Sequence, residues 1–196
     1  MGGVRLPASE GEHDSGAGSY FRELKDFQTS TRRKIMVHKK WILLADANAA
    51  EADQTLRALA ASHAPSTVVL ARDGAEVLDC LQARNGFKSR PAGFPALVLL
   101  ELHLPKVDGW EVLRTMRNDP RLKTIPIVVF TSSRDAGDLV RSYELGANAY
   151  VVKPAHLRQL AAVLDEVRMF WIVINEPPLG HPGEQHLEPE HFATAA

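Results

Sequence analysis

The chain has 196 residues, of which 45% are apolar and 24% are charged, and its formal net charge is -1. These values are typical of a globular chain with one domain of about 100–150 residues and about 50 further residues. They exclude wholesale disorder and give no reason to expect a nucleic-acid or membrane partner. The single cysteine, Cys80, excludes an intrachain disulfide. No apolar run approaches the ~20 residues of a membrane span and no signal-peptide pattern opens the chain, so we expect a cytoplasmic protein.

Strand-like and helix-like segments alternate from Lys40 onward. Five short apolar runs, typical of strands buried on both faces, occupy residues 41–45, 67–71, 96–100, 125–130 and 149–152. Five stretches with helical spacing of apolar residues occupy residues 49–63, 74–84, 110–118, 136–145 and 156–170. This alternation predicts an α/β fold with a parallel sheet covered on both faces. The common five-stranded solution is the doubly wound, flavodoxin-like order 2-1-3-4-5.

The flanking segments differ in composition from this domain, which we place at residues 39–168. Residues 1–38 are expected to form a flexible extension, in which Tyr20–Phe27 has the spacing of a short amphipathic helix. Residues 169–178 form an apolar arm, and residues 179–196 are expected to be disordered. The histidines of that tail match no compact metal-ligand spacing: His181, His186 and His191.

Polar residues follow the predicted strands at the edge where their carboxyl ends meet. Asp46 and Ala47 follow the first strand, and Glu101 follows the third. Thr131 follows the fourth strand and Lys153 follows the fifth. Binding sites of doubly wound sheets lie at this edge, so we expect these side chains to converge in one crevice.

Four stretches around these strand ends resemble the receiver domain of two-component response regulators, and the resemblance covers about residues 40–175. The matching stretches are Ile42–Asp46, Leu99–Gly109, Ile125–Thr131 and Gly146–Pro154. Further features are similar to the regulators paired with cyanobacterial and bacterial phytochromes. They are the Gly/Pro loop 85–95, Asn118–Lys123, Arg141–Asn148 and the Phe170–Trp171 pair.

The resemblance implies a phosphoacceptor aspartate after the third strand and an acidic pair that holds Mg²⁺. It also implies a lysine and a threonine that bind the phosphoryl group, and an aromatic switch residue on the fifth strand. Lys153, Thr131 and Tyr150 match the last three positions, and Asp46 matches the first member of the acidic pair. The chain departs from the pattern at its two most demanding positions. Ala47 replaces the second acidic residue, and Glu101 replaces the phosphoacceptor.

Both departures point away from phosphoryl transfer. The family-type ligands that remain are Asp46, Glu101 and the His103 carbonyl, so we expect Mg²⁺ binding to be weak or lost and no other cofactor. Glu101 carries one extra methylene, about 1.5 Å of reach, and in-line transfer tolerates such misplacement badly. We predict a standing Glu101–Lys153 ion pair, with Thr131 as a further donor to Glu101. Glu101 can fix either an active or an inactive state, and both alternatives stay open. The role of residues 1–35 is also open, and Met36 is a candidate for an alternative start.

The arm is predicted to join two copies of the chain. Its large apolar residues are Phe170, Trp171, Ile172 and Ile174. Because five βα units already bury their faces, this surplus indicates a two-fold homodimer built from the last helix and the arm. The alternative is that the arm folds back on its own core.

These observations favour a non-enzymatic receiver without an output domain that acts without phosphorylation. Its expected partner is a histidine kinase, with a phytochrome photoreceptor as the candidate, and residues 49–60 and 154–158 form the expected docking face. The first alternative is a receiver that still takes phosphate in a Mg²⁺-dependent way, on Glu101 or Asp46. The second is a flavin or nucleotide binder, which is disfavoured because no Gly-rich loop follows the first strand.

Two smaller expectations concern single residues. Trp110 is expected to be a surface or loop aromatic after the Asp108–Gly109 turn. The Lys153–Pro154 bond is a candidate cis peptide by analogy with the family.

Overall fold

The computed structural model describes residues 40–61 and 66–176. The predictions for the 1–38 extension, its Tyr20–Phe27 helix and the 179–196 tail with its histidines lie outside the described residues.

The sheet has five parallel strands in the order β2-β1-β3-β4-β5, which confirms the predicted doubly wound order. The strands are β1 (Trp41–Ala45), β2 (Thr67–Ala71), β3 (Leu97–Leu100), β4 (Ile127–Thr131) and β5 (Ala149–Val152). Ala45 pairs with Ala71 on one side and with Leu100 on the other, so the carboxyl ends of the three strands lie level. Thr131 pairs with Val152 at the same end of the sheet.

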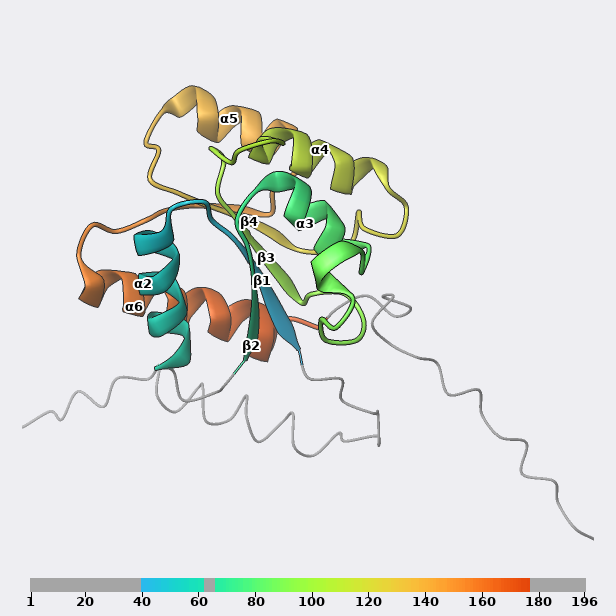
Figure 1. The fold of residues 1–196 in the computed structure, drawn as a ribbon. Helices are drawn as coiled ribbons and strands as arrows, with labels where there is room; N and C mark the ends of the chain where they lie inside the picture. Colours follow the sequence, from blue (N-terminus) through green and yellow to red (C-terminus); the bar gives the residue numbers. More distant parts are fainter. Residues whose placement is uncertain (1–39, 62–65, 177–196) are drawn as a thin grey trace, which may run out of the picture. The chain divides into compact units, whose positions relative to one another are not determined.

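Helices cover both faces of the sheet, as Figure 1 shows. One face carries α2 (Ala49–Ala60) and α6 (Leu157–Arg168), and the other carries α3 (Gly74–Leu81), α4 (Gly109–Asn118) and α5 (Ala136–Glu144). A 3-10 turn, η1 (Asn85–Phe87), follows α3, and a π-helical segment, η2 (Met169–Ile174), continues α6. An Asn or Asp side chain caps the first turn of α2 to α5 and fixes where each helix begins. None of the described helices is long and apolar enough to cross a bilayer.

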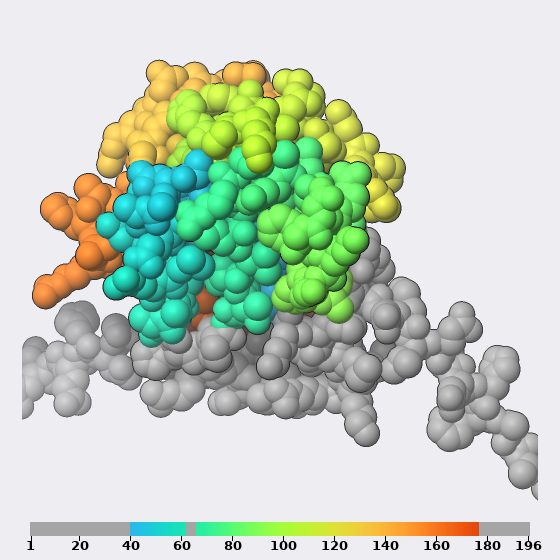
Figure 2. Space-filling view, viewed as in Figure 1, coloured from blue at the N-terminus to red at the C-terminus, as the bar shows by residue number. Residues whose placement is uncertain are grey.

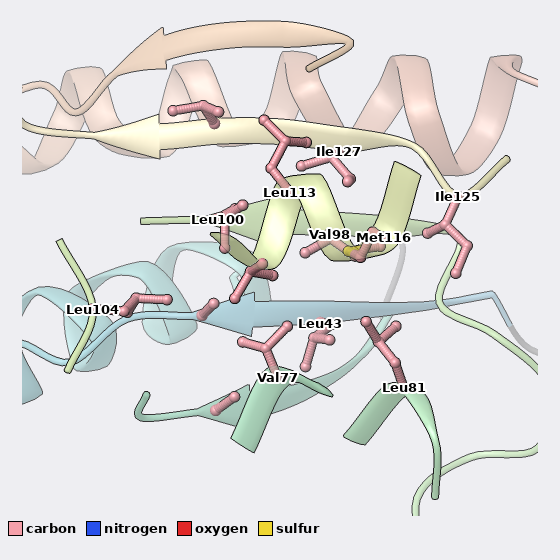
Figure 3. Close-up of a cluster of buried hydrophobic side chains, with 14 of the residues drawn as sticks. Leu43, Val77, Leu81, Val98, Leu100, Leu104, Leu113, Met116, Ile125 and Ile127 are labelled. Carbon is pink, nitrogen blue, oxygen red and sulfur yellow. The ribbon is translucent and has the colours of Figure 1, made fainter. Parts of the chain in front are cut away.

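Two apolar clusters hold the layers together, because successive strand residues point to opposite faces. The first cluster joins Leu43 and Val98 to residues of α3 and α4, including Val77 and Met116 (Figure 3). The second lies under α2 and α6 and includes Ile42. In the view of Figure 2, α2, α3 and α4 close over the sheet, so most strand side chains are withdrawn from solvent.

Three sequence predictions were wrong in detail. The strand predicted at 125–130 begins at Ile127, because the N–H of Ile125 bonds to the Leu122 carbonyl in the preceding turn. The helix predicted at 74–84 ends at Leu81, since Ala83 and Asn85 have φ of 51° and 50°. The Lys153–Pro154 bond is trans.

Trp110 was also misplaced, since it is buried rather than a surface aromatic. It is the second residue of α4 and belongs to the first apolar cluster. The guanidinium carbon of Arg141 lies 4.3 Å from its ring centroid, and the His103 ring meets it edge-on at 5.6 Å. Two polar side chains therefore cover the outer part of a core residue.

The apolar arm partly folds back on its own domain. Trp171 and Ile172 pack against the second cluster, and Lys40 Nζ donates to the Asn175 carbonyl at 3.1 Å. Ile174 is half-buried, whereas 49% of Phe170 is exposed. The arm therefore leaves one large aromatic side chain on the surface.

Candidate functional site

The carboxyl ends of β1, β3, β4 and β5 bring four of the predicted residues together, namely Asp46, Glu101, Thr131 and Lys153. Lys153 Nζ donates to Asp46 Oδ2 at 2.9 Å and to Glu101 Oε2 at 2.8 Å, so the predicted ion pair with Glu101 is present. A third acceptor is Glu51 Oε2, at 2.8 Å. Only 7% of the Lys153 side chain, 1% of Asp46 and 11% of Glu101 are exposed. An ammonium with three N–H groups thus meets three carboxylates in a buried pocket.

The second carboxylate oxygen of Glu101, Oε1, accepts hydrogen bonds from the other donors of the pocket. Thr131 Oγ1 donates to Glu101 Oε1 at 2.6 Å. The backbone N–H groups of Leu102 and His103 donate to the same oxygen at 2.8 and 3.4 Å. Together with Lys153, four donors surround the Glu101 carboxylate, which is the environment of a bound anion.

Burial and charge shift the pocket's pKa values in different directions. Burial raises the pKa of Asp46, and its bonds from Lys153 and Asn48 only partly offset this. Burial also acts to raise the pKa of Glu101, but the bonds from Lys153 and Thr131 outweigh it and hold that pKa below its ordinary value. For Lys153, the hydrogen bonds to its three carboxylates outweigh desolvation and raise the pKa above its ordinary value. Lys153 is therefore a permanent cation at neutral pH.

A hydrogen-bonded path leads from Glu101 to the predicted switch residue. Thr131 Oγ1, which donates to Glu101, accepts from the Ser133 N–H at 3.3 Å. Tyr150 donates its hydroxyl to the Ser133 carbonyl at 3.2 Å and packs its ring against the first apolar cluster. Tyr150 is therefore half-buried against the first apolar cluster, with its hydroxyl bonded to the backbone of the loop that follows Thr131.

Glu51 is the pocket residue that the sequence analysis missed. It lies in the first turn of α2, where Asn48 caps the helix by accepting from the N–H groups of Ala50 and Glu51. Asn48 also donates its side-chain amide to Glu51 Oε1 at 2.9 Å and its backbone N–H to Asp46 Oδ1 at 2.9 Å. The signal was an Asn followed three residues later by a Glu, which resembles a capping box. The cap turns Glu51 back towards the strand ends.

The donor set does not fit the Mg²⁺ site that the family implies. Ala47 brings a methyl group, which packs against the first apolar cluster, where the family has a carboxylate. Each oxygen of Asp46, Glu51 and Glu101 already accepts from an N–H or O–H group, and the three carboxylates converge on an ammonium. Across residues 40–61 and 66–176, no group of three His, Cys, Asp or Glu side chains is disposed to hold a metal ion. Mg²⁺ needs oxygen ligands in near-octahedral geometry, and these oxygens are committed elsewhere.

The fold and the strand-end pocket define a class of signalling protein. The profile of the response regulator receiver domain matches residues 42–165. The chain belongs to this family, as the sequence motifs predicted, and is therefore a receiver of two-component signalling.

Within that family the chain is similar to phytochrome-associated regulators. Response regulator Rcp1 of Synechocystis is 35% identical over 133 residues, which are 68% of this chain and 89% of Rcp1. The crystal structure of its Mn²⁺-bound form matches with a TM-score of 0.64 and 34% identity over 71% of this chain and 99% of that one. The phosphorylated cyanobacterial phytochrome response regulator RcpA matches with a TM-score of 0.66 and 39% identity over 72% and 99%. The bacteriophytochrome response regulator AtBRR is 47% identical over 70% and 98%, with a TM-score of 0.57.

Proposed function

We propose that this chain is a receiver that signals without an aspartyl phosphate, because Glu101 provides the anion that the pocket recognises. One observation carries this proposal. The Glu101 carboxylate accepts from Thr131, from two backbone N–H groups and from Lys153. A hydroxyl, paired amides and an ammonium are the donors that bind phosphoryl oxygens. Here they bind a side chain instead.

The state that Glu101 fixes is the anion-bound one. Thr131 Oγ1 donates to Glu101, and Tyr150 packs against the first apolar cluster while its hydroxyl donates to the Ser133 carbonyl. A carboxylate has less charge and fewer acceptor oxygens than a phosphoryl group, so this is a partial mimic of activation. Divalent metal is dispensable in this state, because Lys153 neutralises part of the charge of the three carboxylates.

The proposed work of the protein is docking rather than catalysis. Its partner is a histidine kinase, with a phytochrome photoreceptor as the candidate, and the similarity to RcpA and AtBRR supports this choice. The docking face consists of α2 and residues 154–158. Leu157 of this face is 60% exposed, so it offers an apolar side chain to a partner.

A homodimer completes the proposal. Phe170 keeps 49% of its surface exposed at the end of α6, and its ring meets Trp171 edge-on with centroids 4.9 Å apart. An exposed aromatic side chain, supported from below by a partly buried tryptophan, suits an isologous contact between two copies of the arm.

Intact-mass spectrometry after incubation with acetyl phosphate and Mg²⁺ tests the central claim. We expect no phosphoryl adduct on the native chain, and an adduct on the Ala47→Asp/Glu101→Asp double variant, which restores the family residues. An adduct on the native chain would overturn the proposal and support the alternative, a Mg²⁺-dependent phosphoacceptor that uses Glu101 or Asp46.

A further inference from the structure

Glu51 belongs both to the buried pocket and to the surface of α2. Its side chain is 36% exposed, compared with 1% for Asp46 and 11% for Glu101. One of its oxygens accepts from Lys153 inside the pocket, and the other accepts from Asn48 at the helix cap. Glu51 is therefore the carboxylate of the pocket that a molecule bound at the surface can reach most easily.

Lys153 connects Glu51 to the segment that leads into α6. Its backbone N–H donates to the Thr131 carbonyl at 2.7 Å, and residues 154–156 follow it directly before α6 begins. In Figure 2 the orange atoms of this segment protrude beside the blue atoms at the start of α2. The Lys153–Glu51 bond thus joins two surface segments that come from opposite ends of the domain sequence.

The same ammonium also binds Glu101, so the two surface segments and the anion position share one cation. If Glu101 releases Lys153, the ammonium keeps only Asp46 and Glu51. If Glu51 is withdrawn towards a surface partner, Lys153 keeps only the two buried carboxylates. Either change leaves Lys153 with two of its three acceptors.

We propose that Glu51 is a positioning residue that couples the Lys153–Glu101 ion pair to the relative placement of the first turn of α2 and residues 154–158. The coupling rests on the proposed function only for the claim that these two segments dock a partner. Communication between them follows from one shared, buried ammonium whose three acceptors lie directly after β1, directly after β3 and in the first turn of α2.

Amide hydrogen exchange on the full chain, without partner, phosphate or metal, tests this coupling. The informative amides are those of Lys153, Leu160 and Ala52, which donate to the carbonyls of Thr131, His156 and Asn48. In Glu51→Ala we expect the Lys153 and Leu160 amides to exchange at least about threefold faster, because the loop loses its anchor to α2. In Glu51→Asp both amides should exchange more slowly than in Glu51→Ala, since the shorter carboxylate keeps part of the attraction to the Lys153 ammonium.

The matched control is Asp53→Ala on the same helix. Asp53 bonds at 2.9 Å to Arg57, and both side chains are largely exposed, so this variant removes a carboxylate and an ion pair without touching Lys153. We expect Lys153 and Leu160 to exchange in Asp53→Ala as in the native chain. The Val112 amide of α4, which bonds to the Asp108 carbonyl, should be unchanged in every variant and reports intact folding. Equal effects of Glu51→Ala and Asp53→Ala at Lys153 would overturn the proposal.

The reciprocal experiment separates coupling from a local contact. Glu101→Gln should change exchange of the Ala52 amide in the native background and should have no further effect on it in Glu51→Ala. Additive effects of the two substitutions would contradict the coupling. This outcome is independent of the phosphorylation assay, so the two proposals can fail separately.

Discussion

Lys153 supplies the cation of the pocket, since its single ammonium forms ion pairs with three carboxylates. Lys153→Ala leaves Asp46 and Glu101 buried without their cation, and breaking a buried pair in this way costs about 3 kcal/mol or more. We expect urea unfolding to show a loss of that size in the free energy of unfolding. Arg57→Ala removes an exposed cation from α2 and should change stability very little. Similar losses in the two variants would contradict a structural role for the buried cluster.

Glu101 gives this stabilisation a definite pH dependence. Its pKa in the folded protein lies below the ordinary value of 4.5, so its carboxylate stabilises the fold above about that pH and loses the contribution as pH falls through the folded pKa. The stability difference between the native chain and Glu101→Gln should therefore be largest near neutral pH and shrink below pH 4.5. The contribution of Asp46 to the pH dependence has the opposite sign, because burial raises the pKa of Asp46. Both proteins contain Asp46. Unfolding curves at several pH values measure the difference, and a difference independent of pH would refute this role.

Most residues of the pocket were predictable from the sequence, but its complete hydrogen-bond network was not. Glu101 and Lys153 follow strands, and Thr131 ends one, at an edge where the carboxyl ends must meet, so their contact follows from topology. Glu51 lies on a helix, and its direction depends on the Asn48 cap, which is a matter of local geometry. The burial of Trp110 was not predicted, because Arg141, whose guanidinium lies over the Trp110 ring, comes from a distant segment of the chain.

At the scale of the elements, the close approach of α4 to the end of β3 positions Glu101. Gly109 opens α4, and a Cβ at this position would lie 2.5 Å from the Glu101 carbonyl oxygen and 2.7 Å from the Leu102 Cα. Gly109→Ala must therefore move backbone next to the pocket, at a cost of about 1–3 kcal/mol. Gly86 is the matched control, because a Cβ there meets nothing within 4 Å. Thermal unfolding should show a lower Tm for Gly109→Ala only, and equal Tm values would contradict the crowding argument.

The strands were easier to predict than the points where elements stop. β1, β2 and β5 have the predicted limits, because continuous apolar runs mark strands buried on both faces. The end of α3 depends on the left-handed conformations of Ala83 and Asn85, which no pattern of apolar residues reveals. The change from α6 to a π-helical segment was likewise invisible, since apolar spacing does not distinguish the two helix types.

For the whole molecule, the arm makes a prediction about assembly. Phe170→Ala should convert the proposed dimer into a monomer, because Phe170 is the large aromatic residue that the arm leaves exposed. Light scattering coupled to size exclusion measures the mass. Leu139→Ala is the control, since Leu139 is 41% exposed on α5 and lies outside the arm. A dimer that survives Phe170→Ala, or one lost in Leu139→Ala, would place the contact elsewhere.

The anion in the pocket is part of the chain itself, and this determines how long the signal lasts. A phosphoryl group on a receiver has a lifetime, which a phosphatase or hydrolysis can shorten, and the signal decays with it. A carboxylate that belongs to residue 101 is present from synthesis to degradation of the chain. In the proposed function the strength of the signal therefore follows how many molecules the cell contains, and it does not decay through loss of a phosphoryl group.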